Sequence, residues 1–383
     1  MDLKLMLKLR PSFFFFSFLI FIFLLQKPGL GSASSPKCIS TERQALLTFK
    51  QSLTDPSGRL SSWSGPDCCK WYGVRCDRRT SHVIKIDLRN PNQTLRPYDY
   101  YGEFKKGGLG GKINPSLTRL KFLRYLDLSS NDFNFLAIPE FIGRIVSLRY
   151  LNLSFTSLSG EVPKSFGNLL KLESLDLYAQ TFIDDGPTSY TLRASNLVWL
   201  WGLSTSLTYL NMGYVSLSGA GETWLRDFSR FSKLKELHLF NCEVKKLPLY
   251  LPSSANLKLL EVLDLSRNYI GSPITNWLFD LTSFRELYLQ QDNIQGSIPS
   301  GFKKLKLLEK LDLSNNVLTG EIPGVLGDLP QLKYLDLSVN KLEGRTLKNL
   351  KFKDPSIYIG NELLCGEPLP KKCPRKQQNA VAN

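Results

Sequence analysis

Residues 308–323 read LEKLDLSNNVLTGEIP, which is the pattern L-x-x-L-x-L-x-x-N-x-L followed by G-x-I-P. The first part of this pattern recurs at Leu123–Asn131, Leu260–Asn268 and Leu332–Asn340. Looser copies begin at Leu148, Leu172, Leu207, Leu234 and Phe284. The last three intervals between copies are each 24 residues long. Such a fixed period predicts a stack of similar units that bury their apolar faces against one another.

A period of about 20–29 residues with this consensus is the signature of leucine-rich repeats. Each unit then supplies one short strand to a parallel sheet, and its leucines point into a shared core. We therefore expect an α/β solenoid, a leucine-rich-repeat horseshoe of about ten repeats. The second leucine of each repeat, or its equivalent, is Ile86, Leu126, Leu151, Leu175, Leu210, Leu237, Leu263, Leu287, Leu311 or Leu335.

The asparagine of the pattern follows the strand, where its side chain can satisfy backbone groups of a buried bend. Asn131, Asn268, Asn316 and Asn340 occupy this place. The middle of the array is predicted to be its least regular part, because five other residues interrupt this series. These are Thr156, Gln180, Val215, Cys242 and Asp292.

Residues 1–33 have the features of a secretory signal peptide. Basic residues precede an apolar run from Phe13 to Leu25, and small residues follow at Gly31–Ala33. A membrane anchor is the alternative, but a spanning helix needs about 20 apolar residues. We expect an exported, soluble protein, located in the apoplast. It would be at the plasma membrane if the chain is a truncated form of a receptor.

The chain is strongly basic, with 49 Lys and Arg against 34 Asp and Glu and a net charge of +15. Such a field favours anionic partners such as an acidic polysaccharide or an acidic protein surface. A solubilising surface explains the same charge. A nucleic-acid partner is not expected for an exported chain.

The remaining chain divides by composition and period into four parts. An N-terminal cap is expected at 34–80, the repeats at 81–345, a C-terminal cap at 346–375 and a polar tail at 376–383. Longer intervals place insertions near 90–106 and 178–206. In the N-terminal cap, residues 41–44 read TERQ and resemble a helix capping box. Its four cysteines, Cys38, Cys68, Cys69 and Cys76, allow three disulfide connectivities.

The run from Cys38 through CCKWYGVRC at 68–76 resembles the N-terminal cap of plant leucine-rich-repeat proteins. Residues 360–373, GNELLCGEPLPKKC, resemble the C-terminal cap of the same family, and GxIP or GxVP elements occur at Gly160, Gly296 and Gly320. The resemblance implies plant-type repeats and the disulfides Cys38–Cys68, Cys69–Cys76 and Cys365–Cys373.

Phrases such as SHVIKIDL at 81–88 and LRYLDLS at 123–129 are most similar to plant receptor-like proteins of the immune type. Members of that family have an ectodomain, one membrane helix and a short tail without a kinase. The resemblance implies an extracellular protein, peptide or polysaccharide ligand and a receptor-kinase adaptor. The chain departs from the family in having fewer repeats than is typical and no membrane helix.

Two other interpretations remain open. The first is a secreted inhibitor of microbial cell-wall hydrolases resembling polygalacturonase-inhibiting proteins, which also have about ten repeats and no anchor. Those proteins usually carry more cysteines in the C-terminal cap than the two found here. The second is a fragment of a gene without function.

Residues that would indicate an enzyme or a metal site are not grouped in the sequence. The two histidines, His82 and His238, are too few and too far apart for a metal cluster. Asp184 and Asp185 stand in a DDGP turn with no partner histidine. We therefore expect no catalytic residues, no metal and no cofactor, and we interpret the odd cysteine, Cys242, as a buried structural residue.

Aspartate or asparagine after the second leucine and serine after the third are the usual outward residues of these repeats. Aromatic and other departures from this rule gather in the central repeats, and we predict that they line a ligand site on the concave face. They are Tyr178, Tyr214, His238, Phe240, Tyr288 and Gln290. Drifted surface residues are the alternative. Asn92 and Asn152 stand in N-x-[ST] motifs and are the predicted glycosylation sites.

Overall fold

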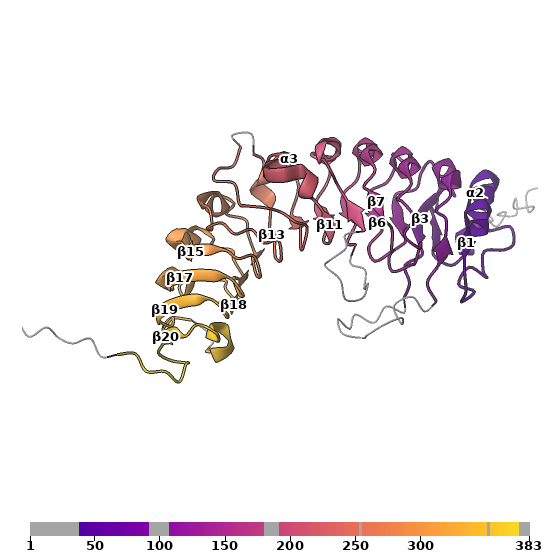
Figure 1. Ribbon diagram of the computed structural model, residues 1–383. Coiled ribbons are helices and arrows are strands. Elements are labelled where there is room, and N and C mark those ends of the chain that lie inside the picture. Colours follow the sequence, from indigo (N-terminus) through magenta and orange to yellow (C-terminus); the bar gives the residue numbers. More distant parts are fainter. Residues whose placement is uncertain (1–37, 92–106, 180–190, 253–254, 351–352, 375–383) are drawn as a thin grey trace, which may run out of the picture.

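The computed structural model describes residues 38–91, 107–179, 191–252, 255–350 and 353–374. They form a curved row of stacked repeats, with a cap at each end (Figure 1). The predicted signal peptide, Asn92, Gln180 and the tail lie outside these residues. So does most of the first predicted insertion.

One 11-stranded sheet runs the length of the concave face. Ten of its strands, among the described residues, are parallel and in register, so that equivalent leucines face one another in successive repeats. The first strand, β2, pairs antiparallel with β3 and comes from the N-terminal cap. In spatial order the strands are β2 (Val74–Cys76), β3 (Val83–Asp87), β5 (Tyr125–Asp127), β6 (Tyr150–Asn152), β8 (Ser174–Asp176), β10 (Tyr209–Asn211), β12 (Glu236–His238), β13 (Val262–Asp264), β14 (Glu286–Tyr288), β16 (Lys310–Asp312) and β18 (Tyr334–Asp336).

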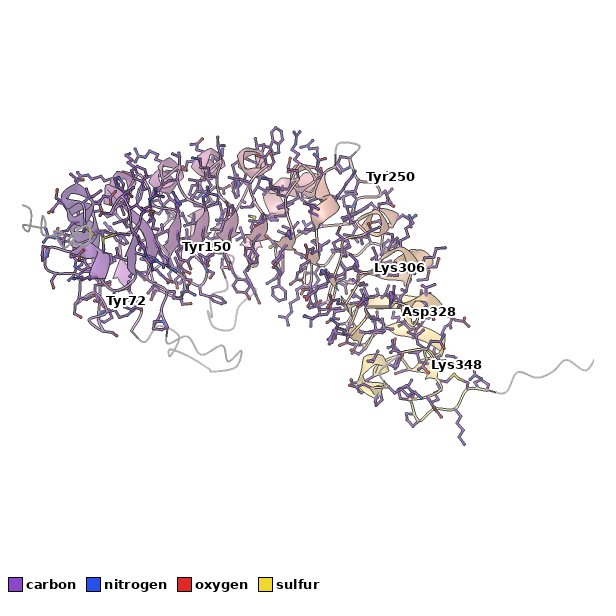
Figure 2. The ribbon with its side chains drawn as sticks, turned by 180° about the vertical axis from the view of Figure 1, so that it is seen from behind. Tyr72, Tyr150, Tyr250, Lys306, Asp328 and Lys348 are labelled. Atoms are coloured by element: carbon purple, nitrogen blue, oxygen red, sulfur yellow. A yellow bond between two sulfur atoms is a disulfide. The ribbon has the colours of Figure 1, made fainter. Side chains whose placement is uncertain are left out.

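Short helices line the convex face, nearly all of them 3₁₀. They are η3 (Pro115–Arg119), η4 (Glu140–Arg144), η5 (Lys164–Asn168), η6 (Val198–Leu203), η7 (Ser218–Thr223), α3 (Trp224–Phe228), η8 (Leu257–Leu259), η9 (Asn276–Asp280), η10 (Ser300–Lys304) and η11 (Gly324–Leu326). Lys306, Asp328 and Lys348 follow one another down the C-terminal repeats in the reverse view (Figure 2). Part of the second predicted insertion is regular structure, because residues 192–203 contain β9 and η6.

A second, shorter layer of strands is interrupted in the middle of the molecule. On the N-terminal side it consists of β7 (Gly160–Glu161), β9 (Leu192–Arg193) and β11 (Val215–Ser216). On the C-terminal side it consists of β15 (Gln295–Ser297), β17 (Val317–Glu321), β19 (Lys341–Arg345) and β20 (Leu363–Cys365). The row of repeats changes direction between these two sheets, beyond α3 (Figure 1).

A ladder of asparagine side chains holds successive bends together, as the pattern predicted. Asn316 donates through Nδ2 to the carbonyls of Leu289 and Leu313 at 2.7 and 3.0 Å. Its Oδ1 accepts from the backbone N–H groups of Asp292 and Ile294 at 3.1 and 3.0 Å. These four backbone groups of the bend are thereby paired away from water.

Two residues that the pattern did not single out extend this ladder into the caps. Asn361 donates to the carbonyl of Leu337 at 2.9 Å and accepts from the N–H of Leu342 at 3.0 Å. In the first repeat, Arg59 of the N-terminal cap donates to the carbonyl of Leu88 at 2.9 Å and to Oδ1 of Asn131 at 3.1 Å. Each cap therefore supplies the hydrogen bonds that a further repeat would supply.

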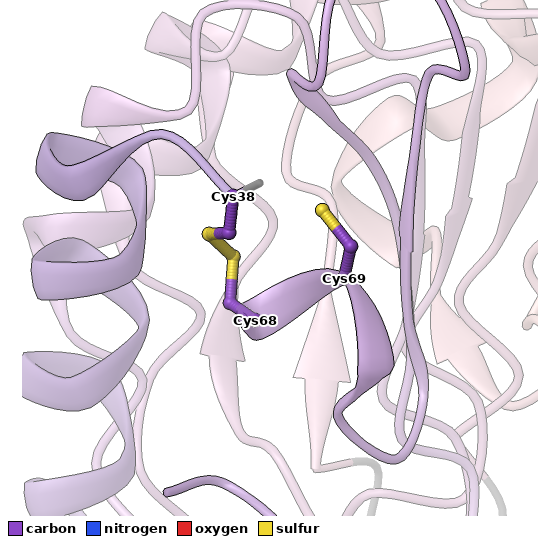
Figure 3. A group of neighbouring side chains, drawn as sticks. All are labelled: Cys38, Cys68 and Cys69. Atoms are coloured by element: carbon purple, nitrogen blue, oxygen red, sulfur yellow. A yellow bond between two sulfur atoms is a disulfide. The ribbon is translucent and has the colours of Figure 1, made fainter. Parts of the chain in front are cut away.

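The N-terminal cap is built on α2 (Ser40–Gln51), η1 (Cys68–Lys70) and a two-stranded pair of β1 (Leu53–Thr54) with β4 (Gly110–Gly111). Disulfides join Cys38 to Cys68 and Cys69 to Cys76, which confirms the pairing that the family resemblance implied. The sulfurs of Cys68 and Cys69 point to different partners from adjacent positions of η1 (Figure 3). The three sulfurs within reach of a common metal ion, those of Cys38, Cys68 and Cys69, are all used in disulfides.

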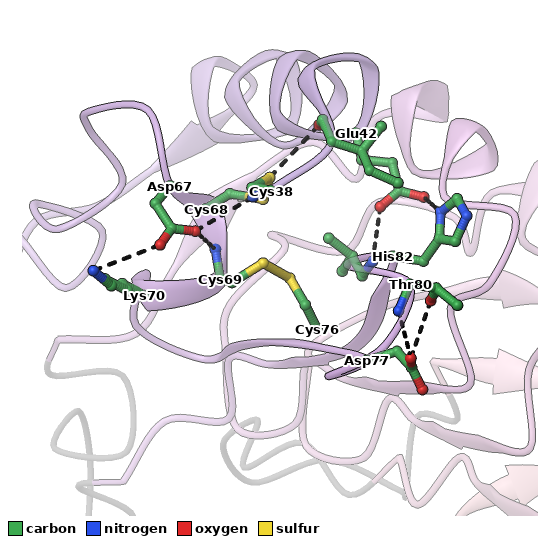
Figure 4. Close-up of a disulfide and its surroundings, with 12 residues drawn as sticks. Cys38, Glu42, Asp67, Cys68, Cys69, Lys70, Cys76, Asp77, Thr80 and His82 are labelled. Carbon is green, nitrogen blue, oxygen red and sulfur yellow. Dashed lines mark hydrogen bonds and ion pairs between the residues drawn. A yellow bond between two sulfur atoms is a disulfide. The ribbon is translucent and has the colours of Figure 1, made fainter. Parts of the chain in front are cut away.

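The predicted capping box is wrong. The helix begins after Ile39, which makes no side-chain capping bond. Glu42 points away from the helix start instead: it accepts from His82 Nδ1 at 2.8 Å and from the N–H of Val83 at 2.7 Å (Figure 4). Its carboxylate is used to fasten the first repeat strand to the cap.

The C-terminal cap contains η12 (Pro355–Tyr358) and β20, which pairs with β19. The disulfide Cys365–Cys373 closes it, as the resemblance implied. Ile357 and Tyr358 are buried against the last repeat, and they cover the end of the leucine core.

Candidate functional site

The concave face presents four columns of side chains, each running from repeat to repeat. The strands stand about 4.8 Å apart, so residues at equivalent positions lie within contact distance across the sheet. We call these columns first to fourth. Taking the repeat Leu311–Asn316 as reference, they pass through Lys310, Asp312, Ser314 and Asn315. Each residue of a column therefore has the residues at the same position of the adjoining repeats as its neighbours.

Four aromatic side chains form a continuous line across the third and fourth columns. The ring centroids of Phe155 and Tyr178 lie 4.7 Å apart, those of Tyr178 and Tyr214 5.4 Å, and those of Tyr214 and Phe240 5.3 Å. The guanidinium carbon of Arg267 lies 5.2 Å from the centroid of Phe240. We call these four rings and Arg267 the aromatic row. The four rings are half-buried, and Arg267 is exposed.

The row zigzags between columns, because a large residue in one column stands beside a small one in the other. Tyr178 and Phe240 belong to the third column, and Tyr214 belongs to the fourth. Gly213, the third-column residue of its repeat, leaves room for the ring of Tyr178. A Cβ atom on Gly213 would lie 2.6 Å from that ring.

The fourth column has a left-handed backbone in most repeats. Its residues include Ser130, Asn241, Arg267 and Asn315, with φ between 50° and 61°. Phe155 and Tyr214 adopt φ of 55° and 62° in the same column. Asparagine tolerates this region best among side-chain-bearing residues, whereas a bulky aromatic residue there is an outlier.

The structure thus brings three of the six predicted site residues together, namely Tyr178, Tyr214 and Phe240. Sequence reasoning missed Phe155 and Arg267, which belong to the same row. The signal for Phe155 was available, since Phe155 and Tyr214 are the two aromatic residues of the fourth column. Arg267 carried no such signal, because an arginine at the surface is ordinary.

The other three predicted residues lie on the same face but outside the row. His238 is in the second column, where its Nε2 lies 3.5 Å from the Glu236 carboxylate and its ring 5.6 Å from that of Tyr209. The hydroxyl of Tyr288 donates to Glu286 at 2.7 Å. Gln290 follows Phe240 two repeats further along the third column, and its Oε1 is buried with no hydrogen-bond donor among the described residues.

Carboxylates of the second column lie beside the row. Burial raises the pKa of Asp176 to about 6, although the N–H of Tyr178 donates to it at 3.1 Å. Burial also raises the pKa of Asp264, against hydrogen bonds from Ser266. Tyr209 reaches Asp176 with its hydroxyl at 3.5 Å. This strip of the face is therefore polar, and burial favours the neutral form of both carboxyl groups.

Ion pairs occupy the outer edge of the sheet, next to the first column. Lys235 pairs with Glu261 at 3.1 Å, and Arg285 pairs with Glu261 and Glu309 at 3.5 and 2.7 Å. Lys333 pairs with Glu309 at 2.5 Å. Basic and acidic side chains alternate along this edge, so these charges are paired with one another.

The N-terminal part of the face differs from the central part. The rings of Tyr125 and Tyr150 are stacked, 4.1 Å apart and 2° from parallel. The predicted glycosylation site Asn152 lies beside them; its Nδ2 is 3.2 Å from the Tyr150 hydroxyl, and its Oδ1 accepts from the N–H of Ser154 at 2.9 Å. A glycan on Asn152 would start from the concave face, one repeat before Tyr178.

Family models match the chain at both its cap and its repeats. The model described as leucine rich repeat N-terminal domain matches residues 39–77, and leucine rich repeat models match 119–134, 147–169, 259–281 and 286–342. Two similar curated proteins are receptor-like protein EIX1 and receptor-like protein EIX2 of Solanum lycopersicum, each 37% identical. The matches cover 74% and 72% of this chain.

The chain is a leucine-rich-repeat protein related to plant receptor-like proteins. It spans about a quarter of the length of these relatives, 27% of the first and 26% of the second. Solved leucine-rich-repeat ectodomains share its fold. That of the Arabidopsis thaliana receptor kinase GASSHO1/SCHENGEN3, in complex with CASPARIAN STRIP INTEGRITY FACTOR 2, is 30% identical with a TM-score of 0.57, over 69% of this chain and 30% of that one. That of HAESA from Arabidopsis, in complex with an IDA peptide hormone ligand, is 26% identical with a TM-score of 0.55, over 82% and 47%.

None of the helices in the described part of this leucine-rich-repeat chain has the length and apolar character that a membrane crossing requires.

Proposed function

We propose that this chain recognises an extracellular ligand in plant defence and acts through a partner receptor kinase, with no catalytic activity of its own. The observation that carries the proposal is the 37% identity to two tomato receptor-like proteins over about three quarters of the chain. The site of action would be the apoplast, or the plasma membrane if the chain belongs to a longer receptor.

The ligand site we propose is the central concave face, from Phe155 to Gln290. It holds the aromatic row, which supplies contact area, and the polar groups of the second column, which can orient a ligand through hydrogen bonds. Two of the relatives of known structure are ectodomains in complex with CASPARIAN STRIP INTEGRITY FACTOR 2 and with an IDA peptide hormone ligand. An extracellular peptide or protein is therefore the first class of ligand to test.

The test is a defence response in leaves that express the full chain. Fungal culture filtrate is infiltrated, and the burst of reactive oxygen is recorded for the unmodified chain and for the double variant Phe240→Ala/Tyr288→Ala. The matched control is Tyr334→Ala, an exposed concave tyrosine in the last repeat strand, outside the proposed site. We expect the unmodified chain to change the burst of reactive oxygen and the Tyr334→Ala control to change it equally. The double variant should leave the burst as it is without the chain.

The proposal fails if the chain leaves the response unchanged, or if the double variant behaves like the unmodified chain while accumulating to the same level. Purified protein should also melt at nearly the same temperature with and without the double substitution, because neither side chain belongs to the leucine core. A partner kinase would be identified by co-purification that requires the filtrate.

One observation favours the alternative of a secreted hydrolase inhibitor, namely the ten parallel repeat strands, the number expected for that class. Adding the purified chain to fungal pectin hydrolases decides between the two. Stoichiometric inhibition would favour the inhibitor, and full hydrolase activity at micromolar protein would exclude it.

A further inference from the structure

We propose that the aromatic row binds a neutral, β-linked oligosaccharide, with sugar rings lying along the line from Phe155 to Phe240. This inference rests on the proposed function, since it names the chemical class of ligand for the same face. Three features of the row support this inference. They are the left-handed backbone at two of its aromatic residues, the space that neighbouring residues leave for the rings, and the distance between ring centroids.

The first feature is that the row is maintained against a local preference. Phe155 and Tyr214 hold bulky side chains on a left-handed backbone, in a column where Ser130, Asn241 and Asn315 show the residues that fit more easily. Such outliers persist when the surrounding structure over-determines them, and they gather at binding sites. The row is not needed for the core, which consists of the inward leucines.

The second feature is that neighbouring residues make room for the rings. Gly213 stands where Ser154, Ser266 and Ser314 stand in other repeats, and any side chain on it would collide with Tyr178. The result is four rings in unbroken contact, rather than four isolated aromatic residues. Arg267 closes the line at its C-terminal end with its guanidinium beside Phe240.

The third feature is the spacing. One ring per repeat gives steps of 4.7 to 5.4 Å between centroids. An extended peptide places side chains on one face about 6.6 Å apart, so its side chains would fall out of step with the rings. Each β-linked pyranose unit lengthens its chain by about the length of one sugar ring, which is close to the steps of the row. The aromatic rings are tilted by 39° to 73° against one another, so the C–H groups of a sugar would pack on the ring faces and edges that point toward it.

The groups beside the row suit hydroxyl-bearing rings without charge. Asn211 and His238 lie between Asp176 and Asp264 in the second column, and Gln290 offers a buried Oε1 without a donor. These groups can donate to and accept from sugar hydroxyls. Neither a lysine nor an arginine stands in this stretch of the second column to pair with a polyuronate, which is why we infer a neutral ligand despite the basic net charge.

The experiment uses the purified full chain and four hexasaccharides, with binding followed by calorimetry and by saturation-transfer NMR. Three are β-1,4-linked hexamers of glucose, xylose and N-acetylglucosamine. The fourth, the α-1,4-linked glucose hexamer, has the same chemistry but a coiled chain. Three variants, Tyr178→Ala, Phe240→Ala and Gly213→Ala, alter the row, and Tyr334→Ala serves as the control.

We expect at least one β-linked hexamer to bind and the α-linked hexamer to bind more weakly. Each row variant should weaken the affinity roughly tenfold, and Tyr334→Ala should leave it unchanged. Gly213→Ala is the sharpest variant, because it removes no contact group and acts chiefly by displacing Tyr178; the added Cβ atom would also lie 3.3 Å from Oδ1 of Asn211. Its thermal melt, compared with that of the parent chain, shows whether the fold is retained.

The inference is wrong if no β-linked hexamer binds at millimolar concentration, or if binding is the same in the row variants as in the parent. It is equally wrong if the hexamers fail while a peptide or protein from the filtrate binds and loses affinity in the row variants. That last result would leave the proposed function standing and assign the row to a polypeptide.

Discussion

Asp292 shows how one residue in the asparagine ladder ties stability to pH. It is fully buried where an asparagine is usual, its Oδ1 accepts from the N–H of Asn268 at 2.5 Å, and its Oδ2 is buried without a partner among the described residues. Burial raises the pKa of Asp292 to about 8. A proton on Oδ2 keeps this buried, unpartnered oxygen neutral.

The pKa of an aspartate in the unfolded chain is about 4. Between pH 4 and 8 the folded state keeps the proton of Asp292 and the unfolded state releases it. The free energy of unfolding should therefore fall as pH rises through this window, by an amount on the order of a few kcal/mol. The variant Asp292→Asn should lose this dependence and be the more stable protein at pH 8. Urea denaturation at pH 5 and pH 8 measures the difference, and equal slopes in the two proteins would contradict the account.

Arg59 allows a second test at this scale. Its guanidinium donates to the carbonyls of Leu88 and Arg89 and to Oδ1 of Asn131. The Arg59 side chain thereby takes the place of the ladder asparagine, which the first repeat lacks. Arg59→Met keeps the length of the side chain but removes these donors. We expect a loss of about 1 kcal/mol in the free energy of unfolding, since the carbonyl of Arg89 loses its partner and that of Leu88 keeps only the bond from Asn131. Arg79→Met, on an exposed cap turn, is the matched control, and an equal loss in both variants would refute the role.

At the scale of the element, the N-terminal cap depends on both its disulfides and its aromatic packing. Trp63 is buried, stacks on Trp71 with centroids 5.5 Å apart and donates through Nε1 to the carbonyl of Tyr72 at 2.8 Å. The disulfide Cys38–Cys68 fastens the start of α2 to η1, next to this pair. The cap therefore seals the open end of the first repeat.

The double variant Cys38→Ser/Cys68→Ser should lower the free energy of unfolding of the cap by about 2–4 kcal/mol, because it frees a 30-residue loop. Tryptophan emission should then shift to longer wavelength at a lower denaturant concentration than in the parent. The shift should precede the loss of far-ultraviolet circular dichroism from the repeats. Coincident transitions in the variant would show that the cap does not open by itself.

The whole molecule is a one-dimensional array, in which each repeat contacts its neighbours. Asn316 is the clearest place to test this, because its amide bonds to the backbone of two successive repeats. Asn316→Ala should cost about 2–4 kcal/mol, since several buried backbone groups lose partners.

Hydrogen exchange would show where that cost falls. We expect protection to drop in the strands β14, β16 and β18 and to be kept in β3, β5 and β6. Uniform loss of protection from β3 to β18 would mean that the repeats open as one cooperative unit. Lys306→Ala, at an exposed position just before the same strand, provides the control.

Much of this architecture could be predicted from residue pattern alone. The period of the leucines predicted the number of parallel strands, because each repeat can bury its inward leucines only by stacking one strand on the strand of the preceding repeat. The three disulfides followed from family resemblance rather than from spacing, which left three connectivities open. The capping box at 41–44 was wrong, because the contact of Glu42 with His82 spans 40 residues and leaves no local signal.

What the sequence by itself determined is the solenoid, since its repeat is local and each unit repeats the same inward and outward alternation. Only the tertiary structure decided the candidate site. Successive members of the set Phe155, Tyr178, Tyr214 and Phe240 are separated by up to 36 residues, and they meet because the parallel strands bring one residue from each repeat into line. Whether a side chain on one strand has room for its neighbour depends on residues such as Gly213, whose effect exists only after the strands have paired.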